Sequence, residues 1–207
     1  KQEVLDVAYG GGMPVGTFMD ASDPYYVDFT SLYPYNPEKA KELLRDAGVE
    51  TDRILEMVLP QNYEPHVRAG QIYQEMLQRV GLPVKIRLVD WSTWISDVYR
   101  KANYDLTVIG HTGKLDPDSR LSNYGTDKMY VRWIHPEAAA LITKARQTMN
   151  VGERKALYSR VLEIMAKEVP FVYVGTSYRY IGTRKSIEGF RIQPKLDAYD
   201  FRDVEIR

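Results

Sequence analysis

The sequence contains no cysteine in its 207 residues. A disulfide scaffold, a zinc site with cysteine ligands and a thiol nucleophile are therefore excluded. The sequence also lacks a run of about 18 consecutive apolar residues, the least that a membrane span requires. No basic region followed by an apolar stretch opens the chain, so no targeting signal is visible. Because the chain begins without Met and inside a predicted helix, we expect it to be a piece of a longer protein.

An excess of charge of either sign is absent as well. The 28 Lys and Arg residues balance the 28 Asp and Glu residues. A balanced chain has no long-range field that would attract nucleic acid or an anionic membrane. We therefore expect no nucleic-acid partner, and a ligand must be recognised by local groups.

Several catalytic and cofactor motifs are missing. There is no GxSxG elbow, no dinucleotide-binding glycine pattern and no Walker lysine. The three histidines, His66, His111 and His135, are too scattered to indicate a metal site. We expect neither a metal nor a cofactor. No spacing singles out a pair of glycosidase carboxylates, so the sequence favours a binding protein, with a carbohydrate-active hydrolase as the alternative.

Predicted strands and helices alternate through the middle of the chain. Apolar and β-branched residues predict strands at 54–59, 84–88 and 104–109, the last buried on both faces. Helical periodicity predicts helices at 64–80 and 91–102. This alternation favours an α/β fold with a mostly parallel sheet flanked by helices, and it places ligand sites in loops at the carboxyl ends of strands.

The flanking regions differ in character. Further helices are predicted at 2–9, at 37–47 behind the N-cap Asn36, at 136–149 and at 152–168, followed by a short strand at 171–174. After Gly175 the sequence is poor in helix, with weak strand character at 178–181 and 201–206. We therefore expect two units, residues 1–175 and a tail of residues 176–207.

Six segments in order carry a family resemblance: KQEVLDVAYGG, YNPEKAKELLRDAGV, GLPVKIRLVDW, YDLTVIGHTGKLDPD, PFVYVG and EGFRI. Together they resemble the family 5 extracellular solute-binding proteins of ABC importers. The resemblance implies a type II periplasmic-binding-protein-like fold, of which residues 1–175 are the second, C-terminal lobe. Residues 176–207 would return across the hinge to pack on a first lobe that is missing here.

The same resemblance implies a function without catalysis. The complete protein would be periplasmic or otherwise extracytoplasmic, with or without a membrane anchor. It would capture an oligosaccharide or oligopeptide by closing two lobes, and would deliver it to a membrane permease. An autonomous protein-interaction domain of shared ancestry stays open as a further alternative.

The loop at residues 110–118 is the first candidate ligand site, with His111, Lys114 and Asp116 as its polar groups. In peptide-binding members of the family an aspartate in this place pairs with the α-amino group of the ligand. Lys114 stands there in this sequence, and Asp116 lies two residues on. The departure favours a sugar slightly over a peptide. Asp116 and Asp118 around a proline are also typical of a simple turn.

Aromatic side chains form the second part of the predicted site. Trp91 and Trp94 are spaced to share one face of a helix, and the chain has 16 Tyr against only 5 Phe. Flat rings with a polar edge suit the faces of sugars. We therefore predict that Trp91, Trp94 and Tyr124 contact the ligand, with packing in the core as the alternative for each ring.

Overall fold

A parallel β-α-β unit forms the centre of the molecule. The computed structural model describes residues 1–50, 52–193 and 198–207. Strand β2 (Leu55–Pro60) pairs in parallel with β3 (Val84–Val89), and helix α3 (Glu64–Arg79) connects them. On the other side of β2, Leu106 forms a single parallel bridge with Met57. Strand β2 is therefore central, and its last four residues are buried.

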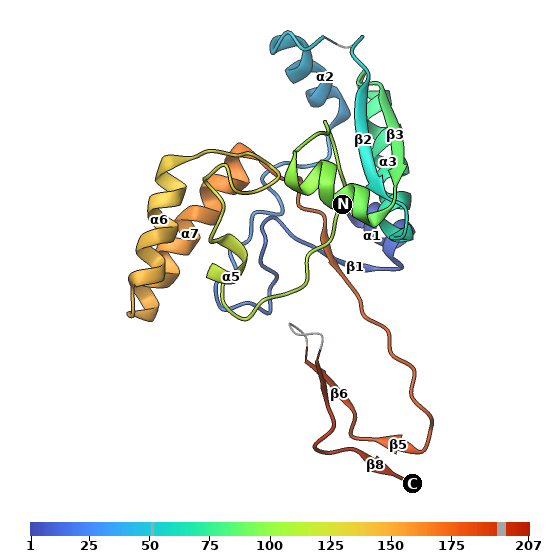
Figure 1. The fold of residues 1–207 in the computed structure, drawn as a ribbon, viewed down its shortest axis with the longest axis vertical. Helices are drawn as coiled ribbons and strands as arrows, with labels where there is room; N and C mark the ends of the chain where they lie inside the picture. Colours follow the sequence, from blue (N-terminus) through green and yellow to red (C-terminus); the bar gives the residue numbers. More distant parts are fainter. Residues whose placement is uncertain (51, 194–197) are drawn as a thin grey trace.

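The alternation of side chains along β2 supplies two cores. Met57 and Leu59 point to the face that α3 covers, where Gly70 lies so close that a Cβ would overlap the side chain of Leu59. Val58 points to the opposite face and packs with Trp94 and other residues of a π-helix, η1 (Trp94–Arg100), which continues the short helix α4 (Trp91–Thr93). Helices thus cover both faces of the strand pair, as Figure 1 shows.

A helical pair forms the other half of the body. Helices α6 (Pro136–Gln147) and α7 (Val151–Glu168) pack together, with the one-turn helix α5 (Asp118–Leu121) beside α6. Asn150 caps α7 by accepting a hydrogen bond from the Glu153 amide. The core of this half contains fully or almost fully buried side chains, among them Leu121, Tyr124, Ile142, Tyr158, Leu162 and Met165.

The first residues of the chain and the segment after α7 meet in a second, two-stranded sheet. Helix α1 (Gln2–Tyr9) ends at Gly10, whose φ of 73° is the left-handed conformation that glycine adopts without strain. Strand β1 (Gly12–Pro14) then pairs antiparallel with β4 (Gly175–Ser177). The two ends of the body are therefore joined.

Helix α2 (Pro37–Asp46) projects from the body in Figure 1. The side chain of Asn36 accepts a hydrogen bond from the Lys39 amide, and Pro37 occupies the first turn, as the sequence predicts. None of its residues is buried, and Leu43 is 56% exposed. Local capping, and not burial in a core, therefore determines where this helix begins and ends.

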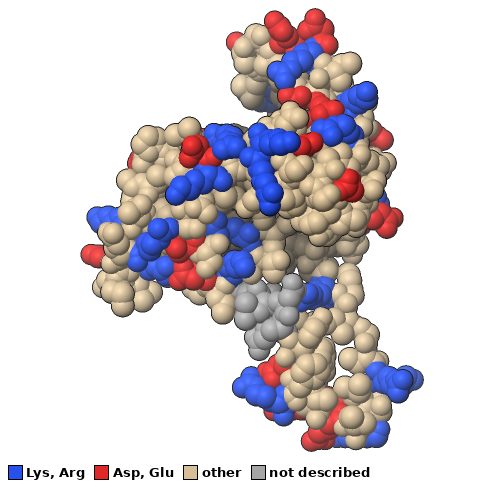
Figure 2. Space-filling view, in the orientation of Figure 1, with Lys and Arg blue, Asp and Glu red and all other residues tan. Residues whose placement is uncertain are grey.

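The tail forms an arm that leaves the body after β4 (Figure 1). It contains two antiparallel pairs: β5 (Ile187–Glu188) with β8 (Glu205–Ile206), and β6 (Arg191–Gln193) with β7 (Ala198–Asp200). Its aromatic side chains are open to solvent, with Tyr180 74% and Phe201 64% exposed. In the space-filling view of Figure 2 the arm again stands apart, and basic and acidic side chains are interspersed on the visible face.

The α/β class is confirmed, and the helices lie close to their predicted ranges. The parallel part of the sheet is narrower than expected: residues 104–109 are not a regular strand and are not buried on both faces. Their residues are exposed or half-buried, and they make a ladder contact with β2 only at Leu106, which bridges to Met57.

The strand predictions for the residues after α7 also need correction. Residues 171–174 are not a strand, since Phe171 and Tyr173 direct their rings at Phe18, at centroid distances of 4.8 and 5.1 Å. Pairing begins only at Gly175. Residues 178–181 do not form a strand, although the Tyr178 amide donates to the Gly11 carbonyl at 3.3 Å, and of residues 201–206 only the last two form a strand, β8. None of the helices built from described residues is long and apolar enough to cross a membrane.

Candidate functional site

The loop that follows residues 104–109 is fixed at its first residue by His66. This histidine lies in the first turn of α3, where its Nε2 accepts a hydrogen bond from the Gly110 amide at 3.1 Å. Its Nδ1 is 2.8 Å from the hydroxyl of Tyr9 in α1. Burial lowers the pKa of His66, which favours the neutral ring that this pair of hydrogen bonds requires. Two helices thereby hold the start of the loop.

His111 makes the next contact of the loop. Its Nε2 is 3.1 Å from the hydroxyl of Tyr130, which is 4% exposed. The imidazole still reaches the surface, but desolvation by the surrounding protein, with a smaller contribution from the charge of Arg120, lowers its pKa to about 4. At neutral pH His111 is therefore an uncharged hydrogen-bonding group.

Asp116 closes the loop. Its two carboxylate oxygens accept hydrogen bonds from the two terminal nitrogens of Arg154 at 2.8 and 2.9 Å, and one of them also accepts from the Asp118 amide. The guanidinium of Arg154 also lies over the rings of Tyr25 and Tyr158. These bonds to Arg154 lower the pKa of Asp116. The carboxylate is thus committed to the fold, which agrees with the alternative prediction of a turn.

Asp118 adds a second link to the helical pair. The Nε of Arg146 in α6 is 3.1 Å from each of its carboxylate oxygens. Helices α6 and α7 therefore each hold one aspartate of the Asp-Pro-Asp sequence. Both ends of the loop are fixed, and the residues between them are exposed.

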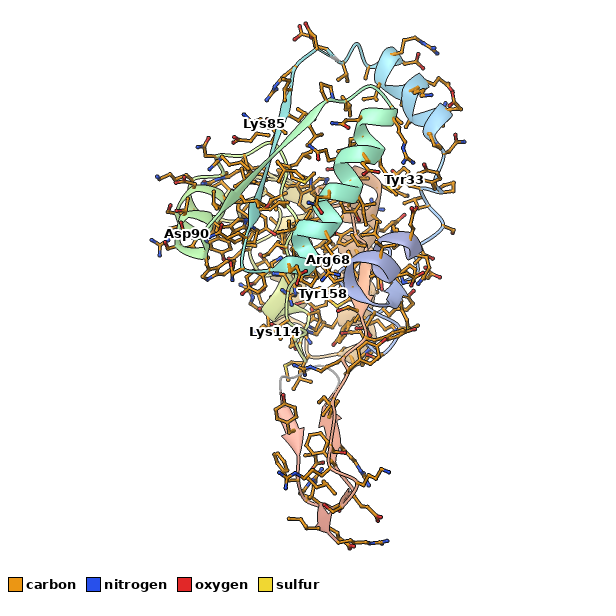
Figure 3. All side chains as sticks on the ribbon, turned by 90° about the vertical axis from the view of Figure 1, so that its right-hand side faces the viewer. Tyr33, Arg68, Lys85, Asp90, Lys114 and Tyr158 are labelled. Atoms are coloured by element: carbon orange, nitrogen blue, oxygen red, sulfur yellow. The ribbon has the colours of Figure 1, made fainter. Side chains whose placement is uncertain are left out.

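Lys114 lies in that exposed stretch. It has no ion pair or hydrogen bond with any residue that the structure describes. In Figure 3 it lies at the end of the body from which the arm leaves. Lys114 is therefore free to meet a ligand or another lobe on that side.

A cleft of about 1420 Å³ lies beside the loop. It is lined by residues 15–20 and 169–177, by the 104–111 segment, and by the first turn of α2. Three of the predicted ligand residues line it: His111, Lys114 and Asp116. The cleft does not include the three predicted aromatic contacts.

Trp91 and Trp94 do share a helix face, as predicted, but they stack on each other. Their ring centroids are 5.1 Å apart, and the rings are inclined by 3°. Trp94 is 2% exposed, and its indole N–H donates to the Thr107 hydroxyl at 3.0 Å. Trp94 is therefore a core residue here, whereas Trp91 is 39% exposed at the end of the stack.

Tyr124 is also enclosed, with 2% of its surface exposed. Its ring packs against Phe18 and Phe171, at centroid distances of 5.2 and 5.3 Å. Its hydroxyl, like that of Tyr173, is buried without a hydrogen-bond partner in the described part of the chain. Such an unsatisfied hydroxyl is uncommon, because burial without a partner costs about 1–3 kcal/mol.

Sequence reasoning missed two residues at this site. His66 is far from the loop in sequence, and only its place in the first turn of a helix after a strand hinted that it faces the carboxyl end of the sheet. Arg120 also lines the cleft, and nothing in the local pattern distinguishes it from a surface residue.

The comparisons with known proteins identify the family. Residues 1–130, more than half of the chain, match the family described as "Bacterial extracellular solute-binding proteins, family 5 Middle". The chain therefore belongs to this family of binding proteins.

Its relatives are considerably longer. The di/tripeptide-binding protein 1 of Pseudomonas aeruginosa is 29% identical over an alignment 205 residues long, which covers 94% of this chain and 38% of that protein. The dipeptide-binding protein of Escherichia coli is 26% identical over an alignment of 100% of this chain and 40% of that protein. The chain thus spans about two fifths of the length of these relatives.

The fold is similar to solved binding proteins. The oligopeptide-binding protein AppA of Bacillus subtilis, in complex with a nonapeptide, superposes with a TM-score of 0.83 at 19% identity, covering 100% of this chain and 45% of that one. The dipeptide-binding protein from Pseudoalteromonas, in complex with Met-Leu, gives a TM-score of 0.81 at 21% identity, covering 99% and 42%. The periplasmic-binding-protein-like class of the fold is therefore confirmed.

Proposed function

We propose that the complete protein is an extracytoplasmic solute-binding protein of an ABC importer, and that this chain supplies its second lobe. Residues 1–175 form the lobe, and residues 176–207 cross to the first lobe. One observation carries the proposal. Lys114, in the anchored loop, and the arm lie at the same end of the body (Figure 3). A first lobe packed on the arm would face the loop.

The surface of the arm supports this arrangement. Tyr180 and Phe201 expose most of their rings, and Tyr199 exposes half of its surface. A hollow of about 560 Å³ on the arm is lined by Ile181, Ile187, Phe190 and other residues. Exposed apolar surface of this kind marks a contact that is absent. An autonomous interaction domain would use the same surface for a different protein, so the first lobe must be tested directly.

A ligand would bind in the cleft between the loop and the first lobe, and closure of the lobes would present the loaded protein to the permease. We place an oligopeptide first as the ligand, because the two relatives described above are named as a di/tripeptide-binding and a dipeptide-binding protein. An oligosaccharide is the second candidate. It was favoured by Lys114, which lines the cleft, and by Trp91 and Trp94, which do not.

Hydrolysis has less support. A glycosidase needs two carboxyl groups that flank the bond to be cleaved. The carboxylates that line the cleft are those of Asp20, Asp23, Asp105 and Asp116, and each accepts hydrogen bonds from the protein itself. No two of them stand out as a pair of acid and base.

A thermal-shift screen of the full-length protein tests the proposal. Di- to pentapeptides are compared with cello- and manno-oligosaccharides, since a ligand of the native state raises Tm by mass action. Stabilisation by peptides supports the first candidate, and stabilisation by sugars alone supports the second. A full-length protein that no solute stabilises, or that turns over a chromogenic glycoside, contradicts the proposal.

A further inference from the structure

We infer that His66 makes solute binding depend on pH: its neutral ring holds Gly110 at the start of the 110–118 loop, and protonation of the ring releases Gly110 and weakens binding. The inference rests on the proposed solute-binding function and adds a means of regulating it. It follows from the direction of the hydrogen bonds at the two ring nitrogens, because only one protonation state of the ring can make both of them.

The two nitrogens of the His66 ring have different roles. Nε2 accepts the hydrogen bond of the Gly110 amide at 3.1 Å, so this nitrogen carries no hydrogen. In the neutral ring the hydrogen is therefore on Nδ1, which lies 2.8 Å from the Tyr9 hydroxyl and donates to it. A protonated ring has a hydrogen on Nε2 as well, and this hydrogen would point at the N–H of Gly110. Protonation of His66 and its bond to Gly110 are thus mutually exclusive.

The ring of His66 also lies directly against the backbone of the loop. A Cβ at position 110 would be only 3.2 Å from both Cε1 and Nε2 of the ring. The rings of Tyr9 and Tyr63 flank the imidazole, with centroids 5.7 and 5.5 Å away. Residues 110–115, by contrast, are exposed. When the bond is lost, the loop therefore has more room to move than the ring.

The described groups that face His66 do not compensate a positive charge on its ring. From α1 it meets the hydroxyl of Tyr9, and burial raises the pKa of Tyr9 to about 12, so this hydroxyl is neutral. From the N-cap of α3 it meets the ring of Tyr63. On its own helix, Glu64 already pairs with Arg68 at 2.7 Å. Burial lowers the pKa of His66, so the ring takes up a proton only below its usual value of about 6.5.

The loop brings a second imidazole to the same place. His111 follows Gly110, lines the cleft and lies 3.1 Å from the Tyr130 hydroxyl through its Nε2. The pKa of His111 is lowered chiefly by desolvation, then by the charge of Arg120 and by that of His66. A proton on His66 therefore removes the anchor of the loop and also changes the electrostatic surroundings of a side chain in the cleft.

Release of Gly110 should weaken binding because the loop would have to be ordered again. Its far end stays fixed, since Asp116 remains paired with Arg154. With one anchor instead of two, the loop loses more conformational freedom when a solute arrives. The net value of one hydrogen bond corresponds to about three- to tenfold in Kd. By linkage, solute binding should in turn expel the proton from His66.

Calorimetry of the full-length protein at successive pH values from about 7.5 to about 4.5 tests this dependence. The probes are tri-alanine and cellotriose, one for each candidate class of solute. In the native protein the Kd of the probe that binds should rise toward acid by about three- to tenfold more than in His66→Gln. Glutamine keeps an acceptor and a donor but does not titrate. Ionisation of the solute itself cancels, because both proteins meet the same solute.

Two further variants separate His66 from the other histidines. His135→Asn keeps a side-chain acceptor at the N-cap of α6, outside the cleft, and should retain the native Kd and its pH profile. His111→Gln removes the second imidazole of the cleft. Whatever its affinity at neutral pH, this variant should lose affinity toward acid by the same factor as the native protein, since His66 is still present.

Hydrogen exchange of the Gly110 amide measures the release without any solute. After correction for the intrinsic exchange rate, its protection in the native full-length protein should fall as the pH is lowered. In His66→Gln the protection should not depend on pH over the same range. The series on the native protein does not depend on whether any variant folds.

Two outcomes would overturn the inference. In one, the protection of Gly110 in the native protein is the same at every pH; in the other, the Kd values of the native protein and of His66→Gln change with pH by the same factor. Neither outcome bears on the proposed function, which depends on whether a solute binds at all. If neither probe binds, a solute from the broader screen takes its place in the same comparison. If that screen also finds none, the proposed function fails, and the effect on binding fails with it.

Discussion

The body and the arm are built from similar residues, but only the body buries them. Tyr158 and Leu162 in α7 are fully buried, whereas Tyr199 and Phe201 in the arm are at least half exposed. Both regions contain aromatic clusters with centroid distances between about 5 and 6.5 Å, so ring contact does not explain the difference. What the arm lacks is a second layer. The stability of a segment depends on the surface opposite it more than on its own composition.

The largest effect is expected in the core of the body. Leu162→Ala removes a fully buried side chain from the packing between α6 and α7. The free energy of unfolding should fall by about 2–5 kcal/mol, since lost apolar transfer and a residual cavity add together. Urea denaturation of the full-length protein measures the change. Leu115→Ala, at a side chain that is 66% exposed, is the control. If Leu115→Ala lowered the free energy of unfolding as much as Leu162→Ala, the contrast between buried and exposed side chains would be wrong.

A smaller effect is expected where polar contacts, instead of apolar ones, join the two halves of the body. Asp116→Asn weakens the paired contact with Arg154 and should lower stability at pH 7 by about 1–2 kcal/mol, the range for hydrogen bonds to charged groups after allowance for exposure. The folded-state pKa of Asp116 is lowered, chiefly by its bonds to Arg154. Its contribution is therefore complete above the unfolded-state pKa, about 3.9, and is lost as pH falls below that value.

Denaturation curves at pH 7 and at successively lower pH check the sign. The native protein should approach the variant in stability as pH falls through the folded-state pKa of Asp116. Asp46→Asn, at an exposed residue on α2, serves as the control for the loss of a surface carboxylate. A gap between native and Asp116→Asn proteins that widens in acid would be evidence against the assignment.

His66 gives a local effect of about 0.5–1.5 kcal/mol, because His66→Phe keeps a ring in place and removes two hydrogen bonds. The folded-state pKa of His66 is lowered by burial. Its neutral form is therefore favoured, and stability should decline as pH falls from the unfolded value of about 6.5. Hydrogen exchange of the Gly110 amide reports the contact and should quicken in His66→Phe. Unchanged exchange at Gly110 would show that His66 does not hold the loop.

The smallest effect is expected in the arm when residues 1–207 are studied alone. Phe201→Ala should alter the unfolding free energy of residues 1–207 by less than about 0.5 kcal/mol, as for other exposed positions. In the full-length protein the same change should have a distinctly larger effect, because the first lobe would cover the ring. Equal small effects in both proteins would mean that nothing packs on Phe201, and the assignment of the tail to the first lobe would be wrong.

Local signals predicted most of the helices, since caps act over a few residues. Asn36 and Pro37 marked the start of α2, and the left-handed Gly10 marked the end of α1. The failures involve partners that are distant in sequence. Residues 104–109 have strand composition, but a strand also needs a continuous ladder with a neighbour, and the sequence does not reveal that these residues bridge to β2 only at Leu106.

The predictions for the site divide in the same way: local features were predicted, and contacts with distant residues were not. The position of the loop followed from the carboxyl end of an α/β unit, and the spacing of Trp91 and Trp94 correctly placed both on one helix face. Which face of that helix meets the sheet could not be read from spacing. Likewise, Asp116 and Arg120 are both charged residues of one loop region, and only the position of Arg154 decides that the first is paired and the second is not.

The double anchoring of the 110–118 loop has a kinetic meaning. Because His66 and Arg154 fix its two ends, the loop has little conformational freedom left to lose when a solute arrives. Preorganised surfaces bind with a smaller entropic penalty, and encounters with them need no slow rearrangement of the recognition element. If the complete protein closes two lobes as proposed, diffusion and lobe opening would govern the rate at which solute enters, and the time that the lobes stay shut would set the lifetime of the complex.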